Sequence, residues 1–221
     1  MKIFLDCSDP ELIREAFDTG LIDGVTTNPS LMLKNGHDPV GVLKEISEIF
    51  PFHASVSAEV VGNTSEEMLD MAEGYVDIGP NITIKVPCTP AGLKACKDLS
   101  GDDIAVNVTL CFSTAQAILA AKAGAAYVSP FVGRLDDNSI AGLQLIKDID
   151  EVFRVQCIHR TKILSASIRY VNSVSQSFAN GAHIVTMPPS VFEKMYNHVL
   201  TDKGLQIFDA DFKETQKLIG G

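Results

Sequence analysis

Short β-rich runs alternate with longer segments of helical period along the whole chain. Eight of the runs are expected as strands, because each is apolar or alternating and is bounded by turn residues. The intervening helices carry ordinary start and stop signals: Pro10 and Thr89 at helix starts, Gly124 and Gly181 at helix ends. The expected strands are residues 3–6, 24–28, 54–60, 82–86, 105–110, 126–130, 162–167 and 183–187.

This alternation predicts parallel strands joined by crossover helices. An open doubly wound sheet and a closed barrel both satisfy it. Eight strands, and the absence of a GxGxxG string after the first of them, favour a single-domain (β/α)8 TIM barrel over residues 1–221. The segment from about 188 to 221 is longer than one helix needs. Two helices are therefore expected there, the last of them available to cover a barrel end or a neighbouring subunit.

Polar residues of one parity end most of the expected strands, whereas the residues between them are apolar. Strands of a barrel are covered on both faces and should read as mostly apolar. If the apolar set packs under the helices, the polar set points into the barrel near its C-terminal mouth, where this fold builds active sites. The set is Asp6, Thr26, Asn28, Ser57, Glu59, Thr83, Lys85, Asn107, Thr109, Ser129, Ser165 and Ser167.

Each member of this set has an ordinary explanation when it is taken alone. A strand lysine usually lies on a solvated face, and Asp6 could cap the following helix. The set as a whole is different, because one lysine and two carboxylates inside a barrel would carry a large desolvation cost without a shared purpose. Amine catalysis suits the set: a buried, neutral lysine can attack a ketone, and Asp6 and Glu59 can move the protons.

Composition and charge narrow the range of partners. Eighteen basic against twenty-eight acidic residues give a net charge of -10, which argues against non-specific nucleic-acid binding. One or two arginines can still hold a small anionic substrate. No signal peptide is expected, and no apolar run approaches the ~20 residues of a membrane span. The cysteines and histidines show no metal-ligand spacing, so we expect a reduced, cytoplasmic protein without metal or cofactor.

Six short strings resemble transaldolase, in order and with compatible spacing. Each string is weak by itself, but six in register are a specific signal that extends from the first strand to about Leu200. The compact length resembles the small subfamily that also contains the fructose-6-phosphate aldolases. The strings are Phe-Leu-Asp at 4–6, Gly-Val-Thr-Thr-Asn-Pro-Ser at 24–30, Ile-Lys-Val-Pro at 84–87, Asn-Val-Thr-Leu at 107–110, Ser-Pro-Phe-Val-Gly-Arg at 129–134 and Ser-Ala-Ser-Ile-Arg at 165–169.

The resemblance implies roles for the residues of these strings. Lys85 matches the Schiff-base lysine, and Asp6 matches the group that removes the hydroxyl proton beside the cleaved bond. Glu59 matches the carboxylate that shuttles protons through a water held by Thr109. The remaining matches concern substrate: Asn28 and Asn107 bind the three-carbon unit, Thr26, Ser129 and Phe131 line the pocket, and Arg134, Ser167 and Arg169 form a phosphate clamp.

Two positions distinguish the subfamilies. The related aldolases carry glutamine at the position of Glu59 and tyrosine at that of Phe131. The resemblance therefore implies transfer of a dihydroxyacetone unit from sedoheptulose 7-phosphate or fructose 6-phosphate to glyceraldehyde 3-phosphate or erythrose 4-phosphate, in the pentose phosphate pathway. An aldolase releasing free dihydroxyacetone, and a catalytically silent barrel that binds sugar phosphates, are the alternatives. Arg134 has an alternative role too, as an ion-pair partner of Asp136 or Asp137.

The resemblance also bears on assembly. Members of this size are ring-like homo-oligomers, often pentamers or decamers, and the long C-terminal segment is compatible with such an arrangement. The expected partners are thus sugar phosphates and further copies of the chain, with no nucleic acid and no membrane.

Overall fold

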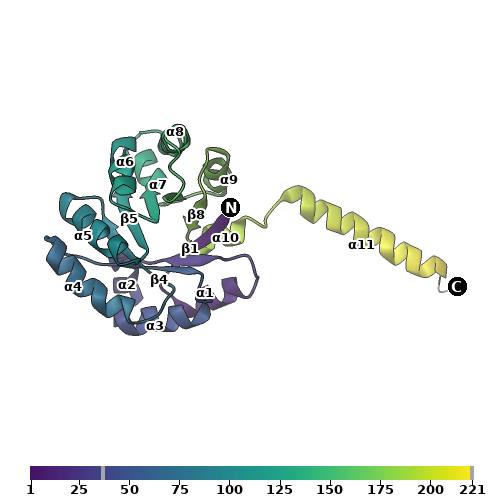
Figure 1. Cartoon of the computed structure of the whole chain (residues 1–221). Helices are drawn as coiled ribbons and strands as arrows, with labels where there is room; N and C mark the ends of the chain where they lie inside the picture. The colour runs from purple at the N-terminus through teal and green to yellow at the C-terminus, as the bar shows by residue number, and fades with distance from the viewer. Residues whose placement is uncertain (36–37, 220–221) are drawn as a thin grey trace.

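Eight parallel strands close into a barrel (Figure 1), which confirms the (β/α)8 fold class. The computed structural model describes residues 1–35 and 38–219. Each strand pairs with the next in sequence, and the last pairs with the first, so the sheet has no edge. The strands are β1 (Lys2–Asp6), β2 (Gly24–Thr26), β3 (Ser55–Glu59), β4 (Ile82–Pro87), β5 (Val106–Cys111), β6 (Tyr127–Pro130), β7 (Lys162–Ser165) and β8 (Ile184–Met187).

Helices cover the outside of the barrel, and the described residues form eleven of them. Short helices follow β2 and β6 before the main crossover helix, and two helices follow β8, as expected for the C-terminal segment up to the described residue 219. They are α1 (Pro10–Phe17), α2 (Pro29–Asn35), α3 (Pro39–Ile49), α4 (Ser65–Val76), α5 (Pro90–Gly101), α6 (Thr114–Lys122), α7 (Val132–Asp136), α8 (Gly142–Val155), α9 (Val171–Ala179), α10 (Pro189–Lys194) and α11 (Val199–Ile219).

The helices begin and end at the residues that local chemistry favours. Thr89 caps α5 by accepting the Gly92 N–H at 3.1 Å. The α6 and α9 helices are followed by Gly124 and Gly181, whose φ angles of +92° and +100° favour glycine. These caps fix the short loops that connect each helix to the next strand.

Apolar side chains form a plug inside the barrel. They are Phe4, Leu164, Ile184 and Ala166, and Ala166 stands at the upper end of the plug, beyond the end of β7. Tyr127 contacts Phe4 edge to face, with ring centroids 6.4 Å apart. A larger apolar layer lies between the strands and the helices. The polar side chains are therefore concentrated above this plug, toward the C-terminal mouth.

Ser165 does not belong to the inward polar set, and its expected orientation is wrong. Its hydroxyl bonds Ser177 of α9 at 2.9 Å, on the outer face of the sheet, while Leu164 and Ala166 point inward. The expected strand extended to 167, but β7 ends at Ser165. Ser167 lies beyond the strand with φ +60°, so strand alternation does not apply to it.

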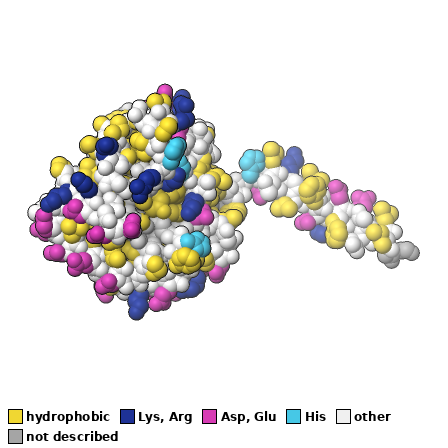
Figure 2. All heavy atoms as spheres, viewed as in Figure 1, with side chains coloured by type: hydrophobic (Ala, Val, Ile, Leu, Met, Phe, Trp, Pro, Cys, Tyr) yellow, Lys and Arg dark blue, Asp and Glu magenta, His cyan; other side chains and the backbone are white. Residues whose placement is uncertain are grey.

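The last helix projects away from the barrel (Figure 1). No residue between Val199 and Ile219 is buried, although several of them are large and apolar. Yellow apolar side chains are accordingly visible along this helix in Figure 2. Within the described part of the chain, no helix combines the length and apolar character required to cross a membrane.

Candidate active site

A cavity of about 420 Å³ opens at the C-terminal ends of the strands. Eleven of the twelve predicted site residues line it, and these come from six strands and the loops that follow the strands. Asn107 is the exception. The eleven are Asp6, Thr26, Asn28, Glu59, Lys85, Thr109, Ser129, Phe131, Arg134, Ser167 and Arg169.

Lys85 and Glu59 form a buried ion pair in this cavity. The Lys85 Nζ atom lies 2.9 Å from Glu59 Oε2 and donates a hydrogen bond to the backbone oxygen of Thr27 at 3.0 Å. Lys85 is only 4% exposed. The two residues are register partners of adjacent strands, which places both side chains on the inner face at the same height. A carboxylate oxygen and a backbone carbonyl oxygen therefore both contact the Lys85 nitrogen.

Asp6 stands three strands from Lys85 in the barrel order and has its own hydroxyl partner. Thr26 donates to Asp6 Oδ1 at 2.8 Å, and these two residues are register partners on β1 and β2. Thr186 of β8 approaches the Thr26 hydroxyl at 2.7 Å and also lines the cavity. The sequence pattern does not indicate Thr186, because it is a single polar residue in the apolar strand β8. Its inward direction is evident only once β8 is paired with β1.

Asn107 lies beneath the cavity wall and is fully buried. Its amide nitrogen donates to Ser57 at 3.2 Å, and its oxygen accepts from Ser129 at 2.7 Å. The two hydroxyls thereby fix which end of the amide faces β6. Contact between Asn107 and a substrate stays a prediction, whereas Ser129 itself reaches the cavity.

A bulge in β5 turns two consecutive residues toward the cavity. Two residues, Thr109 and Leu110, stand opposite the single residue Ser129 where the β5–β6 register shifts. Leu110 has φ +56°, a conformation that a branched side chain adopts only under constraint. Thr109 Oγ1 is buried and has no hydrogen-bond partner among the described residues. Such an oxygen is suited to holding a water or a substrate group.

Two arginines stand at the rim of the cavity. The Arg134 guanidinium stacks over the Phe131 ring, 4.9 Å from its centroid. Arg169 pairs with Asp137 at 3.0 Å, and both side chains are about half exposed. An ion pair with Asp137 was the alternative role for Arg134, but in the structure Arg169 forms that ion pair.

A close backbone contact brings the two arginine segments together. Gly133 donates its N–H to the Ser167 oxygen at 2.9 Å. A side-chain carbon at position 133 would lie 2.0 Å from that oxygen, so only glycine permits the approach. The left-handed backbone of Ser167 and the close approach at Gly133 therefore determine where the side chains of Arg134 and Arg169 leave the backbone.

Two thiols that follow β1 and β4, those of Cys7 and Cys88, have raised pKa values. Burial raises the pKa of the Cys7 thiol, and the charges of Asp9 and Asp6 raise it further against opposing backbone hydrogen bonds. Burial also raises the pKa of the Cys88 thiol. Across residues 1–35 and 38–219, no three histidine, cysteine or acidic side chains are grouped as a metal site.

Comparison with known proteins shows the family of the chain. The Transaldolase/Fructose-6-phosphate aldolase family profile matches residues 3–219. The chain belongs to the transaldolase/fructose-6-phosphate aldolase family. A protein of Paracoccus denitrificans named "Probable transaldolase" is 53% identical over 220 residues, covering 99% of this chain and 100% of the relative. A second protein with that name, from Rhodospirillum centenum, is 50% identical over 97% of this chain and 92% of its own.

Solved structures support the fold of this transaldolase/fructose-6-phosphate aldolase family member. A flavocytochrome b2 variant superposes with a TM-score of 0.63 at 13% identity, over 100% of this chain. The chain spans 65% of the length of that protein. The recombinant flavin-binding domain of baker's yeast flavocytochrome b2 gives a TM-score of 0.62 at 14% identity. At such identities the likeness concerns the barrel alone.

Proposed function

We propose that this protein is a Schiff-base transaldolase in which Lys85 carries a dihydroxyacetone unit between two aldose phosphates. The buried contact of 2.9 Å between Lys85 Nζ and Glu59 Oε2 is the observation that carries the proposal. It places a proton acceptor directly on the amine that must lose a proton before it can attack a carbonyl.

Proton transfer from Lys85 to Glu59 starts the reaction. The neutral amine adds to the ketone carbon of the donor sugar, and the resulting carbinolamine loses water to give an iminium. Glu59 returns its proton to the departing hydroxyl, and a water bound to the Thr109 hydroxyl fits between the two groups. The orphaned Thr109 oxygen supports this assignment.

Asp6 serves the carbon–carbon bond step. It removes the proton from the hydroxyl on the carbon that becomes the aldehyde, the adjacent bond breaks, and its electron pair passes into the iminium. An enamine of dihydroxyacetone remains on Lys85 while the first aldose leaves. Addition to the acceptor aldehyde reverses these steps, Asp6 returns the proton, and water releases the new ketose.

The rim arginines suit the phosphate of either sugar. Arg134 and Arg169 lie on either side of the Gly133–Ser167 contact, and a planar guanidinium binds phosphate oxygens in pairs. Arg169 exchanges Asp137 for the phosphate, and the half-exposed position of this pair keeps that exchange inexpensive.

Glu59 and Phe131 favour transfer over the competing release of free dihydroxyacetone. Glu59 supports the proton relay, and Phe131 presents an apolar ring beside the cavity, packed 5.6 Å from the Phe112 ring. The pentose phosphate pathway and the cytoplasm are the setting that we propose for this reaction, with sedoheptulose 7-phosphate or fructose 6-phosphate as donor.

Borohydride trapping tests the covalent step. Incubation with fructose 6-phosphate and borohydride should leave a reduced adduct on Lys85, mapped by peptide mass spectrometry. Lys85→Ala should abolish both the adduct and transfer to erythrose 4-phosphate, with an unchanged circular dichroism spectrum. A barrel that only binds sugar phosphates would leave no adduct in the parent protein, and an adduct mapped to Lys34, Lys94 or Lys97 would contradict the proposal.

We also propose that the protein works as a homo-oligomer. The exposed apolar residues of α11 support this, because a helix with no buried residue gains little from the barrel of its own chain. A second copy of the chain is the partner we propose for this helix.

A further inference from the structure

Thr186 stands out because none of the transaldolase-like strings includes it. It belongs to β8, is 2% exposed and lines the cavity. Its hydroxyl oxygen lies 2.7 Å from that of Thr26, which in turn lies 2.8 Å from Asp6 Oδ1. Three strands thus contribute one oxygen each to a continuous chain of hydrogen bonds.

The number of available hydrogens gives this chain of hydrogen bonds a direction. A hydroxyl has one hydrogen, and an ionised carboxylate only accepts. With Asp6 ionised, Thr26 must donate to Asp6, so the hydrogen in the Thr26–Thr186 contact belongs to Thr186. When Asp6 holds a proton on Oδ1, the chain can run the other way, from Asp6 through Thr26 to Thr186.

The strand register places Thr186 below Asp6. Asp6 pairs with Thr26 on one side, while on the other side Thr186 pairs with Phe4, two residues earlier on β1. Thr186 therefore holds the Thr26 hydroxyl from beneath, on the side of the apolar plug.

We propose that Thr186 is a positioning residue for proton transfer at Asp6: it orients the Thr26 hydroxyl so that this group follows the carboxyl through both of its protonation states. The inference rests on the proposed function, because it takes Asp6 as the acid–base group of bond cleavage. Donation by Thr186 polarises the Thr26 hydroxyl and strengthens its bond to the carboxylate. A fixed orientation also keeps the carboxyl in a geometry suited to proton transfer.

Thr186→Val tests the proposal, because valine keeps the shape and removes the hydroxyl. We expect kcat for transfer to fall about tenfold, a fraction of what acid–base catalysis contributes, with KM unchanged. Borohydride trapping requires Lys85 and not Asp6, so it should proceed at the parent rate. Thr186→Ser should restore kcat. Ser177→Ala, which removes a buried hydroxyl from the hydroxyl pair behind β7, is the matched control and should keep the parent kcat.

The outcomes separate this inference from the proposed function. No adduct in the parent protein would overturn the function. A normal adduct in Thr186→Val with unchanged kcat, or equal losses of trapping and transfer, would overturn the positioning role, as would a failure of serine to rescue. Neutron diffraction from parent crystals at pH 8 locates the deuterium atoms of these hydrogen bonds directly. This measurement depends neither on activity nor on the folding of any variant. Deuterium on Thr186 pointing to Thr26, and on Thr26 pointing to Asp6, is expected; any other arrangement contradicts the proposal.

Discussion

At the scale of single residues, we expect Phe131 to influence which of two fates the proposed enamine on Lys85 meets. The ring lines the cavity and carries no proton donor. A phenol there could relay a proton to the enamine carbon and so favour hydrolytic release. Phe131→Tyr is therefore expected to raise release of free dihydroxyacetone relative to transfer, and a difference of about 1.4 kcal/mol between the barriers would change their ratio tenfold.

Both rates are measured with fructose 6-phosphate, with and without erythrose 4-phosphate. Phe112→Tyr is the matched control, since it adds the same hydroxyl to the neighbouring ring, which does not line the cavity. If the two rates of Phe131→Tyr fell in parallel, Phe131 would be a packing residue without influence on the partition.

Arg169 allows a second test at this scale. Removing a guanidinium that binds phosphate should cost about 2–4 kcal/mol of transition-state binding. Arg169→Ala should thus lower kcat/KM for phosphorylated sugars and leave the slow turnover of unphosphorylated sugars nearly unchanged. Asp137→Asn, which removes the present ion-pair partner but keeps the arginine, should not lower it. Equal losses on both kinds of sugar would place the phosphate elsewhere.

At the scale of elements, helix α5 and strand β5 each carry one buried thiol. Cys96 of α5 and Cys111 at the end of β5 are fully buried, and burial raises the pKa of each to about 12. The unfolded chain ionises these thiols near their ordinary pKa of 9.0, whereas the folded chain keeps them neutral. This contribution to stability is complete below pH 9 and is lost as the pH rises toward 12.

Urea unfolding at pH 8 and pH 10 measures this loss. The parent should lose more stability between the two pH values than the double variant Cys96→Ala, Cys111→Ala, by roughly 1 kcal/mol for each thiol. Cys157→Ala removes an exposed thiol and is the control, with the parent's slope expected. If the free energy of unfolding changed equally with pH in the parent and the double variant, the two thiols would ionise alike in the folded and unfolded chains.

The elements also show what the sequence could reveal and what it could not. Helix ends depend on local chemistry, and the ends predicted from Thr89 and Gly124 are confirmed. Approximate strand positions depend on the local apolar pattern in the same way. The facing of Ser165 and Thr186 depends on strand length and on pairing partners distant in sequence. Leu110 takes a left-handed conformation that its residue type does not favour, so the bulge at β5 had no local signal.

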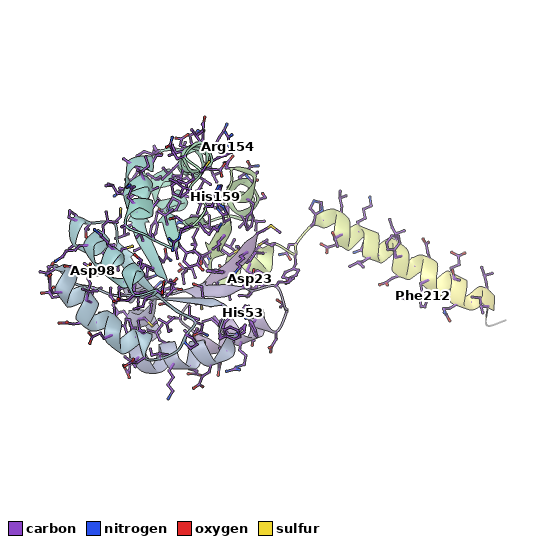
Figure 3. All side chains as sticks on the ribbon, in the orientation of Figure 1. Asp23, His53, Asp98, Arg154, His159 and Phe212 are labelled. Carbon is purple, nitrogen blue, oxygen red and sulfur yellow. The ribbon has the colours of Figure 1, made fainter. Side chains whose placement is uncertain are left out.

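At the scale of the whole molecule, α11 extends from the barrel, and none of its residues from Val199 to Ile219 is buried (Figure 3, where Phe212 is labelled). Leu205, Phe208 and Phe212 share one face and are 57%, 71% and 64% exposed. We expect this face to pack on a second copy of the chain. The double variant Phe208→Asp, Phe212→Asp should then dissociate the assembly into monomers of 23.8 kDa.

Light scattering coupled to size-exclusion chromatography measures the mass. Gln206→Asp places a charge on another side of the same helix and is the matched control, expected to keep the parent's mass. A monomeric parent, or a double variant of undiminished mass, would show that α11 does not hold the copies together.

Closure of the barrel by β1 and β8 has a consequence for the timing of synthesis. Asp6 leaves the ribosome long before Thr186, to which it is linked through Thr26. Until then β1 is the unpaired edge of a growing sheet and is exposed to pairing with other chains. The pocket draws on β1 and β8 together, so a nascent chain acquires it only after β8 has been synthesised.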